Sequence, residues 1–295
     1  MKHIFNISAA VTGYTKVFGI FGKPISHSLS PQMHLAAFQS LGLPCIYLPF
    51  EVDPRHLKKA VGSVVPLGLQ GLNITIPHKQ SVLGLLDELD PAAAKIGAVN
   101  TIEIRSGRLI GHNTDGKGYL ASLYENNIDP GGMPVILVGA GGAARGVAVT
   151  LLFAGVSDMT IMARNLKKGE ALAGDLGALS PKSKVSAVSI EKVQTISKDG
   201  PLLLINTTPL GMDEKDPFPF PPSQIGPGWI VSDLIYDPYE TPLLLAAKKI
   251  GARTIPGLGM LLHQGVLAFE IWTKEKPPVD VMRKTLLKAL TTLKN

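Results

Sequence analysis

Short apolar runs alternate with helical patterns over the first third of the chain. Because parallel neighbours in a sheet need long crossover connections, this alternation predicts a mostly parallel sheet covered by helices. Periodicity and the flanking proline and glycine positions place strands at Val17–Phe21, Cys45–Phe50 and Gly71–Ile76, and helices at Pro31–Leu41, His56–Val64 and Val82–Leu89.

A second series of the same kind begins at Val135. Its apolar runs are rich in valine, isoleucine and leucine with little alternation, which is typical of strands buried on both faces. We expect strands at Val135–Val138, Met159–Met162, Leu202–Ile205 and Trp229–Ile235, with helices at Ala143–Phe153 and near Lys168–Leu176. The last two segments, Met260–Trp272 and Val279–Leu293, also predict helices, but periodicity does not identify the block on which they pack.

Length and composition narrow the class of protein. A chain of 295 residues exceeds what one core usually serves, so two domains are expected, and 45% hydrophobic with 18% charged residues is typical of a well-packed globular protein. The net charge of +6 is spread along the chain, which argues against a nucleic-acid-binding arm and suits an anionic small ligand.

The cysteine count and the hydropathy bear on location. Cys45 is the only cysteine, so neither an intrachain disulfide nor a cysteine metal cluster is expected, and a reducing compartment, by default the cytoplasm, is favoured. No apolar run reaches membrane-spanning length, and the first 13 residues read as a loose tail and not as a signal peptide. We therefore expect no membrane partner and no metal.

A glycine-rich turn follows the strand at Val135. Gly139 permits a tight turn, Gly141 lets the backbone approach a pyrophosphate, and Ala144 fills a position of close helix packing. An ordinary strand-to-helix connection is the alternative interpretation. Since strand, turn and helix occur in the required order, the pattern favours a Rossmann-type dinucleotide site.

The residue after the second strand of this series distinguishes the two nicotinamide dinucleotides. An acidic residue about 20 positions beyond the turn marks NAD. Here the sequence is Ala163-Arg164-Asn165, and a guanidinium can bind a 2′-phosphate with two charge-assisted hydrogen bonds. Arg164 therefore predicts NADP, the alternative being a solvated loop arginine.

Two motifs in the first block carry polar side chains. Ser30 and Pro31 fit the N-cap and first position of a helix, which explains that pair without a ligand, whereas Ser28 has no such role. Two hydroxyls spaced in this way can also hold a carboxylate. Asn73 and Thr75 share one face of a strand, and Lys79 follows it, so these three side chains could meet a ligand, while the neighbouring His78 is interpreted as structural.

Taken together, these motifs resemble the shikimate dehydrogenase family over nearly the entire chain. The resemblance is carried, in the family's order, by Ser28-Leu29-Ser30, Asn73 to Lys79, Gly97 to Thr101, Asn113 to Gly116, the glycine turn, Asn206 to Met212, Asp233 to Pro238 and Gly257 to Gln264. The family often has Asn-Arg-Thr where this chain has Ala163-Arg164-Asn165, so the arginine is kept while its neighbours differ.

The resemblance implies an oxidoreductase acting on a CH–OH group. Its reaction would be the reversible, NADPH-dependent reduction of 3-dehydroshikimate to shikimate, on the route to chorismate and aromatic amino acids. It implies an N-terminal α/β substrate domain over residues 1–116, completed by about 260–295, and a Rossmann NADP domain over 117–259. The C-terminal helices would return to the first domain, and the protein would be a monomer or a homodimer.

The resemblance also assigns roles to residues. Lys79 and Asp115 would be catalytic, with the lysine stabilising and protonating the developing oxyanion. The residues implied in substrate binding are Ser28 and Ser30 at the carboxylate, with Thr75, Asn100, Asp115, Tyr236 and Gln264 at the hydroxyls or the carboxylate end. Those implied in cofactor binding are Gly139, Ala140, Gly141, Gly142 and Ala143 at the phosphates, Arg164 at the 2′-phosphate, and Thr207, Thr208, Met212, Gly257 and Met260 elsewhere along the dinucleotide.

Two alternatives stay open on these residues. A quinate/shikimate dehydrogenase of the same superfamily would differ in substrate or cofactor preference, and both serines with Arg164 favour the biosynthetic enzyme. A nonenzymatic NADP sensor that kept the fold is disfavoured, because Ser28, Lys79, Asp115 and Gln264 are all present.

Overall fold

The first sheet of the computed structural model is mixed. The structure describes residues 11–190, 200–213 and 215–293, and in this part of the chain six strands lie in the order β2-β1-β3-β5-β6-β4. The β1–β2, β1–β3 and β4–β6 pairs are parallel, whereas β5 runs antiparallel to both β3 and β6. The strands are β1 (Lys16–Gly22), β2 (Cys45–Glu51), β3 (Leu69–Ile74), β4 (Glu88–Leu89), β5 (Thr101–Arg105) and β6 (Arg108–His112), and the helices are α1 (Ser30–Ser40), α2 (Leu57–Gly62) and α3 (Pro91–Ile96).

The second sheet is parallel throughout its described pairs. Its order is β12-β11-β10-β7-β8-β9, which is the 3-2-1-4-5-6 order of a Rossmann sheet counted from β7. The predicted Rossmann fold is therefore confirmed. The elements are β7 (Val135–Val138), α5 (Gly142–Phe153), β8 (Asp158–Ala163), α6 (Leu166–Leu179), β9 (Lys184–Ser189), β10 (Leu203–Asn206), β11 (Ile230–Asp233), α7 (Pro242–Ile250) and β12 (Arg253–Ile255).

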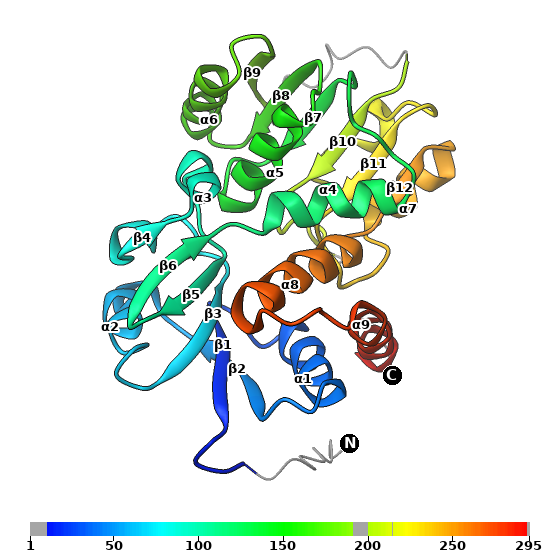
Figure 1. The fold of residues 1–295 in the computed structure, drawn as a ribbon. Helices are drawn as coiled ribbons and strands as arrows, with labels where there is room; N and C mark the ends of the chain where they lie inside the picture. The colour runs from blue at the N-terminus through cyan, green and yellow to red at the C-terminus, as the bar shows by residue number, and fades with distance from the viewer. Residues whose placement is uncertain (1–10, 191–199, 214, 294–295) are drawn as a thin grey trace.

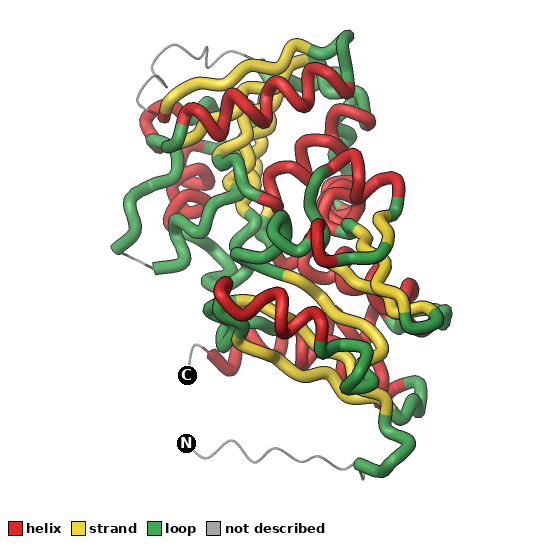
Figure 2. The backbone as a smooth tube through the Cα atoms, turned by 90° about the vertical axis from the view of Figure 1, so that its left-hand side faces the viewer, coloured by secondary structure: helices red, strands yellow, loops and turns green. Residues whose placement is uncertain are grey.

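Two helices join these domains. α4 (Asp115–Glu125) leads from the first sheet to the second, and α8 (Leu258–Thr273) leads back, so that the two helices lie side by side between the sheets (Figure 1). They pack closely because Gly118 has no side chain: a Cβ there would lie 2.6 Å from the backbone nitrogen of Gln264. Figure 2 shows the two layers of strands above and below this helical connection.

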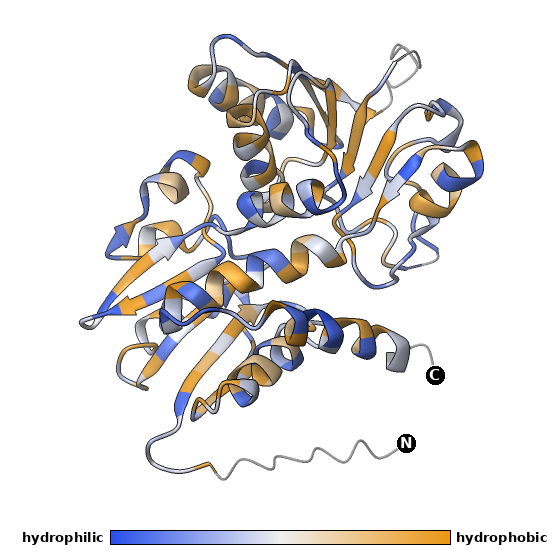
Figure 3. Ribbon diagram, turned by 45° about the vertical axis from the view of Figure 1, so that its right-hand side comes forward, coloured by the Kyte–Doolittle hydropathy of each residue, from blue (hydrophilic) through white to orange (hydrophobic). Residues whose placement is uncertain are grey.

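The C-terminal helices return to the first domain, as predicted. α9 (Val279–Leu293) packs on α1, and Met282, Leu286 and Leu290 of α9 enter a core shared with α1 and α8. The indole nitrogen of Trp272, near the end of α8, donates to the carbonyl of Ile102 on β5 at 2.9 Å. Figure 3 shows that the strands of the second sheet are largely hydrophobic and lie among helices.

One predicted helix is wrong. Residues 82–89 form a 3₁₀ turn (Leu83–Leu85) followed by the short strand β4. The apolar spacing predicts a helix, but the backbone N–H groups of Asp87 and Asp90 donate to the carbonyls of Leu109 and Gly111 on β6, at 3.0 and 2.8 Å. Pairing with a neighbouring strand therefore replaces the helical hydrogen bonds.

The helix start at Ser30 also differs from expectation. The N-cap of α1 is Leu29, no side chain caps the helix, and Ser30 is its first residue. The Ser28 hydroxyl instead accepts a long hydrogen bond of 3.4 Å from the Ser30 amide. Ser30 is buried, and its side chain hydrogen-bonds to the Tyr47 hydroxyl and not to the helix backbone. None of the described helices is long and apolar enough to cross a membrane.

Candidate active site

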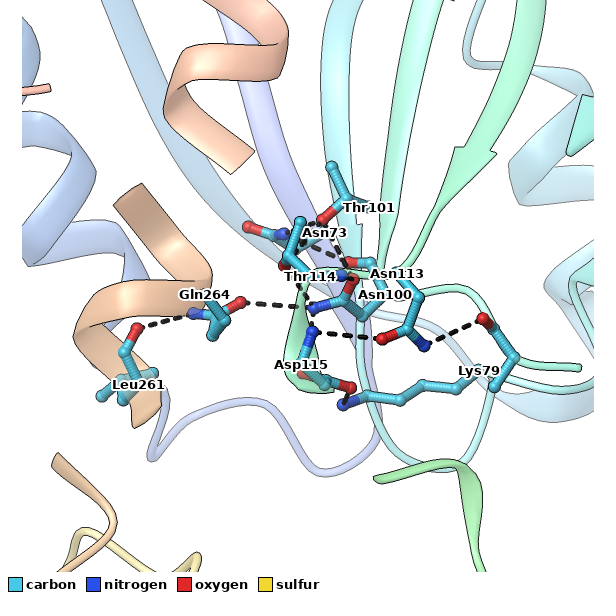
Figure 4. A network of polar contacts seen from close by, with 10 residues as sticks. Asn73, Lys79, Asn100, Thr101, Asn113, Thr114, Asp115, Leu261 and Gln264 are labelled. Atoms are coloured by element: carbon cyan, nitrogen blue, oxygen red, sulfur yellow. Dashed lines mark hydrogen bonds and ion pairs between the residues drawn. The ribbon is translucent and has the colours of Figure 1, made fainter. Parts of the chain in front are cut away.

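An ion pair between Lys79 and Asp115 lies where the two domains meet. Lys79 follows β3 in a loop, and Asp115 is the first residue of α4. The Lys79 Nζ lies 2.6 Å from Asp115 Oδ2, and the two side chains are only 13% and 4% exposed (Figure 4). A lysine and a carboxylate held this close, and largely shielded from water, form a positioned proton donor with its own counter-ion.

Asn100 holds the other oxygen of Asp115. Its Nδ2 donates to Asp115 Oδ1 at 2.9 Å and to Thr114 Oγ1 at 2.8 Å, and its Oδ1 accepts from the Thr114 amide at 2.8 Å and the Thr101 hydroxyl at 3.2 Å (Figure 4). A carboxamide offers two donors and two acceptor positions. All four are therefore used inside the protein, which fixes the Asp115 carboxylate in one orientation.

Asn73 and Tyr47 extend this network behind the pair. The Tyr47 hydroxyl donates to Asn73 Oδ1 at 2.7 Å, while Asn73 Nδ2 donates to the Asn100 carbonyl and to Thr101 Oγ1, both at 3.1 Å. Burial raises the pKa of Tyr47, so that its hydroxyl stays a neutral donor, and Ser30 hydrogen-bonds to the same hydroxyl. One buried tyrosine thus connects Ser30 on α1 with Asn73 on β3.

A cavity between the domains brings together every candidate for substrate binding and catalysis. It is lined by Ser28, Ser30, Thr75, Lys79, Asn100, Asp115, Tyr236 and Gln264, and on its other side by Ala143, Thr207, Thr208, Met212 and Met260. The first set comes mainly from the first domain and the second mainly from the second domain. The two sets therefore face each other across a common space of about 190 Å³.

Tyr236 closes this cavity beside the serine motif. It follows β11, and its hydroxyl hydrogen-bonds to the backbone of Leu29. Burial raises the pKa of Tyr236 to about 12, so its hydroxyl is neutral at working pH. The Ser28 end of the cavity thus offers neutral hydroxyl groups, whereas the cation Lys79 lies with Asp115.

A second cavity, of about 790 Å³, lies along the glycine turn. Its walls include Gly139, Ala140, Gly141, Arg164 and Thr208, together with Asn165, Lys167, Lys168 and Gln80. Thr208 lines both cavities, so the two are neighbours. The basic side chains gather at the end near α6, as expected of a site for an extra phosphate.

The glycine turn has the shape that a diphosphate requires. Gly139 has φ +116°, and a Cβ there would collide with the Thr207 hydroxyl, which itself donates to the carbonyl of Val138 at 2.7 Å. At Gly141 a Cβ would meet nothing within 4 Å, so the backbone there faces open space at the start of α5. Unpaired N–H groups at a helix start attract anions.

Two cofactor candidates line neither cavity. A Cβ on Gly142 would lie 2.8 Å from Lys79 Cβ, so this glycine allows α5 to approach Lys79. The Gly257 amide donates to the Ile235 carbonyl at 3.1 Å, and its neighbours leave no room for a side chain. Both glycines therefore contact residues that line the first cavity.

A buried acid organises the loops that follow β10 and β11. Asp233 accepts hydrogen bonds from Asn206 Nδ2 at 3.0 Å, the Ile235 amide at 3.0 Å and Thr241 Oγ1 at 2.8 Å. Burial raises the pKa of Asp233 to about 6. Asn206 in turn accepts from the amide and hydroxyl of Thr208, at 3.0 and 2.7 Å. One carboxylate therefore positions a residue of both cavities.

Sequence reasoning missed some residues of the site. Tyr47 gave no signal because it lies inside an apolar strand. Gln80 and His27 line the cavities from the positions next to Lys79 and Ser28, and adjacency in the chain was their only available signal.

The fold and the site define a two-domain α/β oxidoreductase of the dinucleotide-dependent class. A parallel sheet of Rossmann order carries a glycine turn, and a second domain presents a lysine–aspartate pair across the cavity. Models of the shikimate dehydrogenase substrate binding domain, shikimate/quinate 5-dehydrogenase and the shikimate 5′-dehydrogenase C-terminal domain match residues 20–102, 125–207 and 257–287. The chain belongs to the shikimate dehydrogenase family.

Individual relatives support this assignment. Shikimate dehydrogenase (NADP(+)) of Desulforamulus reducens is 47% identical over 94% of this chain and 97% of its own. A crystal structure of a shikimate dehydrogenase in complex with NADP+ superposes with a TM-score of 0.87 at 38% identity, covering 96% of this chain and 98% of that one. The enzyme from Thermus thermophilus, in complex with NADP(H) and shikimate, gives a TM-score of 0.82 at 36% identity, covering 93% and 100%.

Proposed function

We propose that the protein catalyses the reversible NADPH-dependent reduction of 3-dehydroshikimate to shikimate, a step toward chorismate and aromatic amino acids. The observation that carries this proposal is the 2.6 Å Lys79–Asp115 pair in a cavity whose opposite wall belongs to the dinucleotide domain. Relatives that cover nearly the whole chain carry the same activity in their names.

The chemistry of this chain centres on Lys79. When bound, the nicotinamide supplies the hydride in reduction and accepts it in the reverse direction. As a carbonyl oxygen gains charge, the ammonium of Lys79 stabilises it and donates the proton, and in the reverse direction Lys79 takes the proton from the hydroxyl. Asp115 keeps the ammonium in place, and Asn100 keeps Asp115 in place.

The substrate carboxylate is proposed to bind at Ser28 and Ser30. The hydroxyls of Ser28 and Tyr236 are neutral, and Ser30 beside them is held by its hydrogen bond to the Tyr47 hydroxyl. Lys79, which is paired with Asp115, supplies the positive charge for the reacting oxygen. Thr75, Asn100, Asp115 and Gln264 would contact the ring hydroxyls between the two ends. A ligand with a carboxylate and a ring alcohol on opposite sides fits this division of groups.

The dinucleotide is proposed to run from the second cavity into the first. Its phosphates would lie at Gly139 to Ala143, where the turn is open at Gly141, and Arg164 would bind the 2′-phosphate. Thr207, Thr208, Met212, Gly257 and Met260 would surround the remaining length. Arg164 favours NADP over NAD because a guanidinium pairs with a phosphate dianion.

The domain limits are proposed as residues 1–116 with about 260–295 for the substrate domain, and 117–259 for the NADP domain. The packing of α8 and α9 on the first domain supports the C-terminal share. The boundary at residue 116 falls in the first turn of α4, whose first residue is Asp115. We further propose a cytoplasmic monomer or homodimer, as a reducing compartment suits Cys45; size-exclusion chromatography with light scattering tests its assembly.

The test is a matrix of shikimate and quinate against NADP and NAD, measured as initial rates of reduced cofactor formation. We expect shikimate with NADP to give the highest kcat/KM. A higher kcat/KM with quinate and NAD would instead favour the quinate/shikimate enzyme, and no turnover in any combination, with NADP binding retained, would favour the sensor.

A further inference from the structure

Arg145 reaches from the second domain to the first. It lies one turn into α5, and its Nε donates to the carbonyl of Ile96, the last residue of α3, at 2.8 Å. Its Nη2 pairs with Asp175 Oδ2 on α6, also at 2.8 Å. The arginine side chain is only 17% exposed, whereas Asp175 is 55% exposed. Figure 1 shows α3 beside α5, at the point where the two domains meet.

The guanidinium of Arg145 matches the C-terminal end of α3 in charge and in shape. The carbonyl groups at a helix C-terminus lack partners within the helix and carry partial negative charge, so a guanidinium is well suited to them. Gly97, the C-cap of α3, has φ +68°, and a Cβ there would lie 3.0 Å from the Arg145 Nη2. The guanidinium therefore lies directly against the backbone of Gly97, which a side chain would prevent.

The residues that follow Gly97 hold the catalytic pair. The Val99 amide donates to the Lys79 carbonyl at 2.8 Å, and Asn100 Nδ2 donates to Asp115 Oδ1 at 2.9 Å. Arg145 thus fixes one end of a four-residue segment whose other end positions both Lys79 and Asp115.

The opposite end of this connection is the glycine turn. α5 starts at Gly142, directly after the open backbone at Gly141, and Gly142 packs against Lys79. Arg145 follows three residues later on the same helix. One rigid element therefore touches the proposed phosphate site at its start and the α3 end through Arg145.

We propose that Arg145 is a positioning residue that couples occupation of the dinucleotide site to the placement of the Lys79–Asp115 pair. It lines neither cavity, so it acts through Ile96 and Gly97 and not by contact with a ligand. The proposal rests on the proposed function. Its consequence is that NADP and shikimate each strengthen the binding of the other, and that this coupling depends on the Arg145–Ile96 contact.

The test uses the full-length Arg145→Met variant, which keeps the length of the side chain and removes its donors. Calorimetry gives the Kd of NADP, the Kd of shikimate, and the factor by which each ligand changes the Kd of the other, while steady-state kinetics gives kcat and KM. We expect kcat to fall at least tenfold and the coupling factor to fall toward one, with the Kd of NADP alone changing less than threefold.

Two further variants separate positioning from structure. Arg145→Lys retains a donor that can reach the Ile96 carbonyl, so it should recover part of the lost kcat and coupling, and it carries the test if the Met variant does not fold. Asp175→Asn removes only the exposed ion pair, and its kcat and coupling factor should stay within twofold of the wild type.

Two results would overturn the proposal. A lower melting temperature with unchanged kcat and coupling in the folded Arg145 variants would show a purely structural role, and a loss of binary NADP affinity as large as the loss of kcat would show a cofactor-holding role. Wild-type protein that does not turn over shikimate with NADP would refute the proposed function itself. Active wild type with wild-type-like Arg145 variants would refute only the coupling.

Discussion

Replacing Lys79 by methionine tests the chemistry most directly. Methionine keeps much of the length and apolar stem of lysine but removes the ammonium that lies 2.6 Å from Asp115. The hydroxyl groups at the Ser28 end of the cavity are untouched, so shikimate should still bind. The lost group is the one proposed to donate the proton as charge develops on the substrate oxygen.

The structure allows the size of the effect to be worked out. A positioned general acid contributes about 10²–10⁴ in rate, or about 3–5 kcal/mol of barrier. We expect the upper half of that range, because both side chains are largely shielded from water. Stability should fall by less than the roughly 3–5 kcal/mol typical of breaking a fully buried pair, because Asp115 keeps its bond from Asn100 and lines the cavity.

A second lysine–aspartate pair provides the matched control. Lys23 Nζ lies 2.8 Å from Asp53 Oδ2, but Lys23 is 42% exposed and lines neither cavity. Lys23→Met should leave kcat unchanged and cost at most about 1 kcal/mol of stability. The assay is the initial rate of NADPH formation with saturating shikimate, together with calorimetric binding of shikimate. If Lys79→Met kept kcat within threefold of wild type, Lys79 could not be the proton donor.

Three further predictions follow from single contacts. Arg164→Asp should weaken NADP binding at least tenfold and leave NAD binding within threefold, since an acid repels the 2′-phosphate; equal losses in titrations with both dinucleotides would argue against its role. Tyr47→Phe should raise the KM for shikimate about fivefold, or about 1 kcal/mol, because Asn73 loses its hydrogen bond from the Tyr47 hydroxyl. Tyr119→Phe removes a hydroxyl from another buried tyrosine and should leave this KM unchanged, so equal KM values for the two variants would contradict the prediction. Burial raises the pKa of Asp233 to about 6, so the contribution of Asp233 to the free energy of unfolding is fully present below about pH 4 and is lost as the pH rises through 6. Urea unfolding of wild type and Asp233→Asn should therefore show wild type losing up to about 3 kcal/mol relative to the variant between pH 4 and 7. A difference that stays constant with pH would show that the pKa is not raised.

The Rossmann half was predictable because its strands are continuous apolar runs. β7, β8, β10 and β11 lie within two residues of the expected positions, and α5 starts one residue early. The Val82–Leu89 segment shows the limit of the same reasoning. Its leucines have helical spacing, yet bonds to Leu109 and Gly111 from across the sheet decide its conformation. Long-range pairing of this kind leaves no local pattern.

Helix α4 was missed for a different physical reason. Gly116 and Gly118 lie in its first turn, and glycine disfavours a helix interior by about 1 kcal/mol each relative to alanine. Both glycines are needed by tertiary contacts: Gly116 approaches the carbonyl of Gly146 on α5, and Gly118 approaches Gln264 on α8. The features that make the helix invisible to propensity are thus those that let it pack between the domains with Asp115 at its start.

Most of the residues that line the two cavities were readable from motifs, but the donors that remain for a ligand were not. Asn100 lines the cavity with all four hydrogen-bonding positions used by the protein, so it can contact a substrate only by giving up an existing bond. The Lys79 ammonium has three N–H donors and donates one of them to Asp115. Ser28 accepts from the Ser30 amide, and within the described chain its own O–H has no acceptor.

The hydrogen-bond donors of Ser28 and Lys79 that are not used within the protein determine how a ligand can lie in the cavity. Ser28 offers a hydroxyl and Lys79 offers its remaining N–H groups in the same cavity, while the side-chain amide of Asn100 is committed to holding Asp115. A ligand must therefore bring one acceptor to Ser28 and another to Lys79 at the same time. A carboxylate and a ring oxygen do this, and a ligand that lacks either does not. Because buried donors without partners are costly, that mismatch penalises the wrong ligand more than the matching contacts favour the right one.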